Sequence, residues 1–312
     1  MTQHIPGARF HALILKAREK PPLPTAIVHP CDDLSLLGAV QAEENGLIAP
    51  LYVGPRAKVL ATAEGVGITL DESRIIDVPH SHAAASRAVE LVREGRAQAL
   101  MKGKLHTDEL LSAVLDKERG LRTERRLSHV FVLDVPLYQR MLLITDAAIN
   151  ISPSLEDLRD IVQNALDLAV SMGIEIPRVA LLSAVETVTE KLPSTVLAAA
   201  ICKMRDRGQI VGGLVDGPLA FDNAISPEAV AAKGIISEVA GKADILVVPN
   251  LESGNMIAKQ LIYLAGAEAA GIALGARVPI MLTSRSDTPA ARLASAALAC
   301  LHAGFLPRKP VT

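Results

Sequence analysis

The chain has 312 residues, 50% of them hydrophobic, and its 32 basic against 34 acidic side chains give a formal charge of −2. This near-neutral balance provides no broad basic surface for nucleic acid or an anionic membrane, so any anion must be bound locally. With no Trp, three Tyr and four Phe, the chain also lacks aromatic surfaces on which single-stranded nucleic acid stacks.

The cysteines and the amino terminus indicate the compartment. Cys31, Cys202 and Cys300 lie far apart and form no CxxC pair, which favours reduced thiols over a disulfide framework. The first residues contain only a brief apolar run followed by basic side chains, so we expect neither a secretory signal nor a membrane span. The sequence therefore predicts a cytoplasmic protein, and its length allows two domains.

In the first third of the chain, short apolar runs alternate with longer amphipathic ones. This alternation is typical of βα units around a mostly parallel sheet. The amphipathic runs end in Gly, which favours left-handed helix caps. The predicted strands cover 25–30, 49–54, 74–79 and 98–103, and the predicted helices cover 33–46, 55–67 and 81–95.

A charged stretch, 116–130, then interrupts the pattern, and we place the passage into a second domain after it. Ser154 and Asp157 have the spacing of a capping box, which predicts a helix over 154–173. Three strand-to-helix passages follow, at 209–234, 243–266 and 278–298. Polar residues follow each of these strands, at the edge of an α/β sheet where ligands bind.

The last passage contains the densest group of polar residues. If 278–282 is a strand and Pro289 lies in the first helical turn, the backbone amides of 284–288 can bind an anion. Arg285 adds a planar cation suited to phosphate, and the Ser284 hydroxyl can donate to an oxyanion. Alternatively, Ser286 or Asp287 only caps the helix while Arg285 is a solvated charge. The spacing leaves both interpretations open.

A second group follows the strand at 98–103. Lys102 and Lys104 flank Gly103, and Thr107 begins a predicted helix. A phosphate site needs close backbone approach, which Gly permits, and a nearby cation. The alternative is an ordinary loop with solvated lysines, because the GxxxxGK[ST] phosphate loop is absent.

Further polar residues follow later strands. Asp146 and Asn150 come after one strand, and Asp216 after another, but their spacing is not that of a tight ligand set, so we predict no metal site. Asn255 and Lys259 lie at a loop-to-helix junction, where Asn has an alternative role as a cap. No GxGxxG follows the first strand, which argues against an ordinary dinucleotide fold.

Five stretches together resemble the phosphate acetyl/butyryltransferase (phosphotransacylase) family. They are "LMKGKLHT", "ITDAAINISP", "VDGPLAFDNAISPEA", "VPNLESGNMIAKQL" and "PIMLTSRSD", in family order. The resemblance implies two α/β domains of the isocitrate/isopropylmalate dehydrogenase type, with a cleft between them and the carboxyl-terminal segment returning to the first. We therefore predict a first domain over 1–139 and 288–312 and a second over 140–287.

The resemblance also implies the reaction. An acyl group passes between coenzyme A and inorganic phosphate by direct attack of the CoA thiolate on acyl phosphate. The expected ligands are acyl-CoA, CoA, phosphate and acyl phosphate, with CoA as a substrate and no cofactor or metal. Family members are homodimers or larger homo-oligomers, and the same is expected here.

In the family motif, the catalytic serine and arginine match Ser284 and Arg285. The acetyl branch has SRG and, several positions later, an acid; here that position is Ala291, and the acid is Asp287, directly after "SRS". This arrangement resembles the butyryl-like branch and argues against acetyl as the preferred group. We hypothesise that Asp287 is the base that takes the thiol proton.

The remaining matches imply substrate-binding roles. Lys102, Gly103 and Thr107 are expected to hold phosphate, and a structural or substrate-positioning role is expected for Asp146, Asn150, Asn255 and Lys259. Arg125 and Arg126 could supply further cations but match the family only loosely. Two alternatives stay open: a metal- and NAD-dependent decarboxylating dehydrogenase on the related fold, and a CoA-binding relative without catalysis.

Overall fold

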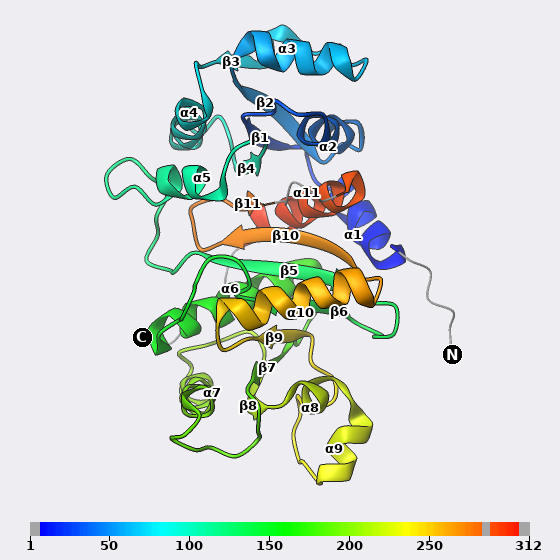
Figure 1. Cartoon of the computed structure of the whole chain (residues 1–312), viewed down its shortest axis with the longest axis vertical. Helices are drawn as coiled ribbons and strands as arrows, with labels where there is room; N and C mark the ends of the chain where they lie inside the picture. Colours follow the sequence, from blue (N-terminus) through cyan, green and yellow to red (C-terminus); the bar gives the residue numbers. More distant parts are fainter. Residues whose placement is uncertain (1–6, 283–287, 306–312) are drawn as a thin grey trace. The chain divides into compact units, whose positions relative to one another are not determined.

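The computed structural model describes residues 7–282 and 288–305 (Figure 1). Its contacts divide the chain into two compact units. The amino-terminal unit comprises Phe10–Arg125 and Ala270–Gly304. The central unit comprises Arg126–Ala269 together with short pieces from both ends of the chain, of which 7–9 and 305 are described. Each unit is a helix-covered, mostly parallel sheet, which confirms the expected α/β class.

The sheet of the amino-terminal unit has the strand order β3-β2-β1-β4-β11-β10. Neighbouring strands are parallel except β10 and β11. The strands are β1 Leu23–Val28, β2 Ile48–Gly54, β3 Ile75–Asp77, β4 Ala99–Lys102, β10 Glu268–Leu274 and β11 Ile280–Met281. The helices are α1 Ala8–Arg18, α2 Asp33–Glu44, α3 Arg56–Gly65, α4 Ser81–Arg93, α5 Thr107–Val114 and α11 Pro289–Ala303, with a short turn η1 at Glu72–Arg74.

The predicted elements of this unit are confirmed to within a few residues at their ends. Gly46, Gly67 and Gly95 follow α2, α3 and α4 with φ values of 72°, 71° and 74°. These left-handed values are accessible to glycine at little cost, so each glycine ends its helix as predicted. Pro289 is the first residue of α11, also as predicted.

The central unit has the strand order β5-β6-β9-β7-β8, in which only the β5–β6 pair is antiparallel. Its strands are β5 Ser128–Asp134, β6 Met141–Thr145, β7 Arg178–Leu182, β8 Leu214–Leu219 and β9 Ile245–Val247. Its helices are α6 Leu155–Met172, α7 Pro193–Asp206, α8 Phe221–Ile225, α9 Pro227–Lys233 and α10 Leu251–Leu264. The capping box at Ser154 and Asp157 is confirmed as the start of α6.

Three strands, β5, β7 and β10, were not among the predicted elements. β5 begins at Ser128, within the last residues of the charged stretch, and pairs with β6 from Val130–Thr145 to Asp134–Met141. That pairing groups 126–139 with the central unit, because antiparallel neighbours share a ladder of backbone hydrogen bonds. The predicted domain limits, 1–139 with 288–312 and 140–287, stay a prediction.

The cores of both units are aliphatic. In the central unit, the buried cluster contains Leu, Ile, Val and Ala from the strands and from the faces of the helices that cover them. The described part of the chain contains no helix that is long and apolar enough to cross a membrane.

His302, near the end of α11, makes the stability depend on pH. Burial, together with the nearby cations Arg125 and Lys20, lowers its pKa from 6.5 to about 4. The unfolded chain therefore binds more protons between these values, so the free energy of unfolding falls as the pH drops from about 6.5 towards 4. We expect urea unfolding of His302→Gln to show a smaller loss across this window. An equal loss in variant and wild type would exclude His302 as the source.

Candidate active site

The turn after β4 lies against the end of β1. Gly103 N–H donates to the Val28 carbonyl at 2.9 Å, and Lys104 N–H donates to the His29 carbonyl at 2.9 Å. A Cβ atom on Gly103 would lie 2.6 Å from the carbonyl oxygens of both Val28 and His29. Only glycine fits here, so the close approach expected at this residue is between two strands of the protein itself.

Lys102 and Thr107 flank this turn. Lys102 is the last residue of β4 and is 5% exposed, so its stem is buried at the carboxyl edge of the parallel strands. Thr107 is the first residue of α5, as predicted. Glu109, in the first turn of α5, accepts hydrogen bonds from Ser81 Oγ at 2.5 Å and from His106 N–H at 3.3 Å. These bonds lower the pKa of Glu109, and the bond from Ser81 contributes most. The Glu109 carboxylate therefore remains charged.

Asp146 and Asn150 form a closed turn after β6 and are 2% and 3% exposed. Asp146 Oδ1 accepts from the N–H groups of Ala148 and Ile149 at 2.9 and 3.0 Å. Asp146 Oδ2 accepts from Asn150 N and Nδ2 at 3.2 and 2.5 Å. The Asn150 amide also donates to the Leu127 carbonyl at 2.9 Å. Both side chains are thus occupied by internal hydrogen bonds.

The Asn150 side-chain oxygen faces Arg126, just before β5. Arg126 Nε donates to it at 2.7 Å, and Asp157 Oδ1 lies 3.4 Å from the same nitrogen. The Arg126 side chain is 55% exposed. The sequence offered Arg125 and Arg126 equally as further cations, because adjacent arginines in a charged stretch do not indicate which of them is anchored.

Asn255 and Lys259 lie on α10. Asn255 Nδ2 donates to the Ala147 carbonyl at 3.2 Å, which links α10 to the turn after β6. The cap of α10 is Asn250, whose side chain accepts from Ser253 N–H at 2.9 Å, so capping does not explain Asn255. Gly254 permits this approach, because a Cβ there would lie 2.9 Å from the Asp146 carbonyl oxygen. Lys259 is exposed one turn further along.

The candidate catalytic residues Ser284, Arg285 and Asp287 lie outside the described residues. The residue that caps the following helix is described: Thr288 Oγ1 accepts from Ala291 N–H at 3.2 Å. Thr288 thus holds the N-cap position of α11.

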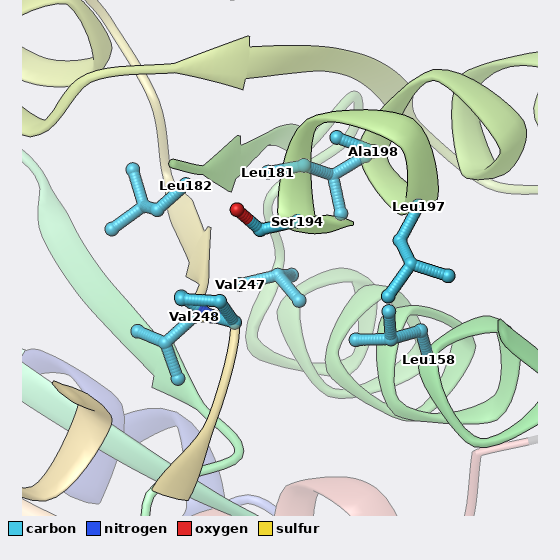
Figure 2. A pocket seen from close by; sticks show the side chains of 9 residues that line it. Leu158, Leu181, Leu182, Ser194, Leu197, Ala198, Val247 and Val248 are labelled. Atoms are coloured by element: carbon cyan, nitrogen blue, oxygen red, sulfur yellow. The ribbon is translucent and has the colours of Figure 1, made fainter. Parts of the chain in front are cut away.

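The central unit has a small apolar pocket at the ends of β7 and β9 (Figure 2). Ser194 at the start of α7 supplies a hydroxyl, which lies 2.9 Å from Ser183 Oγ. The remaining lining residues are Leu158, Leu181, Leu182, Leu197, Ala198, Val247, Val248 and Pro249. Its volume of about 20 Å³ is enough for one water molecule. The pocket is too small for a coenzyme, so it is not the candidate site.

The surroundings of Cys31 bear on thiol chemistry among the described residues. Burial raises the pKa of the Cys31 thiol to about 11, although Lys58 and Lys104 oppose the shift. A thiol with this pKa is a poor nucleophile near neutral pH. Within 7–282 and 288–305, no three His, Cys, Asp or Glu side chains are grouped as metal ligands.

The model of the family described as phosphate acetyl/butaryl transferase matches residues 81–300, more than half of the chain. The chain therefore belongs to this family of acyltransferases. A phosphate acetyltransferase of Rhizobium meliloti is 60% identical over 95% of this chain and 94% of its own length. A phosphate butyryltransferase of Clostridium acetobutylicum is 42% identical over 95% of this chain and 98% of its own.

Solved structures of the family have the same fold. A branched-chain phosphotransacylase from Enterococcus faecalis V583 superposes with a TM-score of 0.77 at 33% identity, over 90% of this chain and 99% of that chain. The relatives' names do not favour the butyryl-like branch inferred from Asp287: the acetyltransferase has the higher identity of the two, 60% against 42%.

Proposed function

We propose that the chain transfers a short acyl group, acetyl by preference, reversibly between coenzyme A and inorganic phosphate. The CoA thiolate attacks the carbonyl carbon of acyl phosphate, the C–S bond forms, and the C–O bond to phosphate breaks with its electron pair leaving on phosphate. The observation that carries the proposal is the family match over 81–300, which spans all the candidate site motifs. The preference for acetyl rests on the name of the 60% identical relative.

The reacting groups that we propose are those of the "SRSD" motif. Asp287 accepts the thiol proton, because the thiolate is the nucleophile and a free thiol has a pKa of about 8.5. Ser284 donates to the oxyanion of the tetrahedral intermediate, and Arg285 neutralises the departing phosphate. These three roles rest on the motif.

Lys102 would supply a second cation for phosphate, next to Gly103 and Thr107. Its place at the end of a parallel strand supports this role, because ligands of α/β sheets bind at that edge. For Asp146, Asn150 and Asn255 the internal hydrogen bonds support positioning rather than direct contact with substrate. Lys259, exposed on α10, remains a candidate for substrate contact.

We further propose the setting in which this reaction takes place. The site lies in a cleft between two α/β domains related to those of isocitrate and isopropylmalate dehydrogenases. The protein is a cytoplasmic homodimer or larger homo-oligomer. CoA is a substrate, and no metal or other cofactor takes part.

A spectrophotometric assay tests the function. With CoA, excess chelator and a series of acetyl, propionyl and butyryl phosphates, we expect thioester formation, with the highest kcat/KM for acetyl phosphate. A higher kcat/KM for butyryl phosphate would reverse the proposed preference. CoA binding without turnover on any acyl phosphate would favour the non-catalytic alternative, and reduction of NAD dependent on a divalent metal and a hydroxy acid would favour the dehydrogenase.

A further inference from the structure

Three buried polar side chains hydrogen-bond to Arg126, two of them to its backbone and one to its guanidinium. Its backbone N–H donates to Asp160 Oδ2 at 2.8 Å, and its carbonyl accepts from Asn164 Nδ2 at 2.9 Å. Its Nε donates to Asn150 Oδ1 at 2.7 Å. Asp160, Asn164 and Asn150 are 9%, 2% and 3% exposed. Buried polar side chains are costly unless they are hydrogen-bonded, and each of these three has one of its bonds to Arg126. Asp160 also accepts from Arg159, and Asn164 also donates to Ser128 Oγ.

The hydrogen bonds behind Arg126 fix its direction as well as its place. Asn150 is itself held by Asp146 and the Leu127 carbonyl, so its side-chain oxygen cannot turn away from Arg126. Only the Nε edge of the guanidinium is anchored. Among the described residues, Nη1 and Nη2 of Arg126 donate no hydrogen bond, and the side chain is 55% exposed. The outer face of a pre-oriented fork is therefore open to a ligand.

Arg126 lies at the edge of the central unit's sheet that in α/β folds generally binds ligands. β6 ends at Thr145, and its partner β5 begins beside that end, since Val130 pairs with Thr145. β9 and β7 run parallel to β6, so Arg126 lies at the carboxyl edge of these strands. The amino terminus of α6 lies nearby, because Asp157 in its first turn reaches Arg126.

We propose that Arg126 binds a phosphate oxyanion of a substrate, and that Asn150, braced by Asp146, is the positioning residue that orients its guanidinium. The proposal rests on the proposed function, whose substrates carry phosphate as acyl phosphate, as inorganic phosphate or within coenzyme A. A planar guanidinium with two free Nη groups matches two oxygens of a phosphate in bidentate geometry. Asp146 and Asn150 thereby acquire a specific form of the structural or substrate-positioning role expected from the sequence.

Binding measured by calorimetry tests the anion site without requiring turnover. Three ligands are titrated: inorganic phosphate, CoA and dephospho-CoA. For Arg126→Gln we expect Kd to rise about 10- to 100-fold for at least one of them, as for loss of a charge-assisted bidentate contact. Weaker phosphate binding identifies the reacting phosphate. Weaker CoA binding with dephospho-CoA unchanged identifies the 3′-phosphate, and equal weakening of both coenzymes identifies the diphosphate.

Arg140 provides a matched control. It is 42% exposed, belongs to the same unit, and donates from Nη1 to the buried Asp244 at 3.1 Å. It precedes β6, so it lies at the opposite edge of the sheet from Arg126. Arg140→Gln should leave all three Kd values within twofold of wild type. Arg126→Gln with all three Kd values also within twofold would overturn the anion site.

The positioning role needs its own readout. Asn150→Ser should weaken the same ligand as Arg126→Gln, but should weaken it no further when Arg126 is already Gln, because the amide then has nothing to orient. Equal effects in both backgrounds would show a merely structural role. If the Asn150→Ser variant does not fold, the Arg126→Lys variant is used to test the positioning role instead. Lysine keeps the charge but loses the anchored fork, so full recovery of affinity by lysine would overturn the positioning role.

These outcomes are separable from failure of the proposed function. A wild-type protein that binds phosphate through Arg126 but forms no thioester from any acyl phosphate would overturn the function and leave the anion site standing. Normal turnover by the wild type, with Kd values unaffected by Arg126→Gln, would overturn the anion site and leave the proposed function standing.

Discussion

Asp287→Asn is expected to lower kcat for thioester formation about 100- to 10,000-fold near neutral pH, the range typical of a lost general base. The amide cannot take the thiol proton, so the reaction then depends on CoA that is already ionised. Below a pH of about 8.5, the pKa of a free thiol, the rate of the variant should rise about tenfold per pH unit. Stopped assays of wild type and variant between pH 6 and 9 measure this dependence.

A control for this variant is Asp33→Asn, which removes an exposed acid from the first turn of α2. It should leave kcat within twofold of wild type, because Asp33 belongs to no candidate site motif. If Asp287→Asn instead retains the turnover and the pH profile of the wild type, another group takes the thiol proton. Ala291 cannot do so, since its methyl group accepts no proton.

Gly103→Ala should lower the free energy of unfolding by about 1–3 kcal/mol, the usual range for overpacking at a tight site. The added methyl would lie 2.6 Å from the carbonyl oxygens of Val28 and His29, so β1 and β4 must separate at their carboxyl ends. Because Lys102 directly precedes the turn, we also expect a higher KM for phosphate. Urea unfolding and initial rates with varied phosphate measure the two effects.

Gly65 is the matched control for this substitution. It is the last residue of α3, and a Cβ there would meet no atom within 4 Å. Alanine at such a site reduces the freedom of the unfolded chain, so stability should stay unchanged or rise by about 0.4–1 kcal/mol. If the Gly103→Ala variant were as stable as the Gly65→Ala variant, the turn after β4 would accommodate the added methyl group without loss of stability, which would contradict the prediction.

Much of the fold is predictable because its signals are local. Gly46, Gly67 and Gly95 end helices through a backbone property of one residue, and Ser154 and Asp157 begin α6 through a contact three residues apart. β5 was missed for the opposite reason. Its role depends on pairing with β6, and the charged residues before it interrupt the alternation of apolar and amphipathic runs from which strands were predicted.

The residues of the candidate site also differ in whether their signal in the sequence is local. Lys102, Asp146 and Asn150 were predicted as site residues because each lies at or just after the end of an apolar strand in a recognisable motif. Arg126 was offered only as a loosely matched cation beside Arg125, because its anchoring depends on Asn150 and Asp160, which are 24 and 34 residues away. Sequence can identify a cation, but whether its direction is fixed depends on partners that only the fold brings together.

The pairing of β11 with β4 has a consequence for the order in which the protein can form during synthesis. Ile280 pairs with Leu100, and Met281 with Met101, so one strand of the amino-terminal sheet is made long after its neighbour. The central unit, Arg126–Ala269, is translated in between. During translation, the edge of β4 that pairs with β11 therefore stays unpaired until the central unit has been synthesised. Closing so long a loop is slow, and an unpaired strand edge invites association with other chains. The nascent chain is thus most exposed to misassembly during that interval. The interval ends when β11 and α11 have been synthesised and β11 can pair with β4.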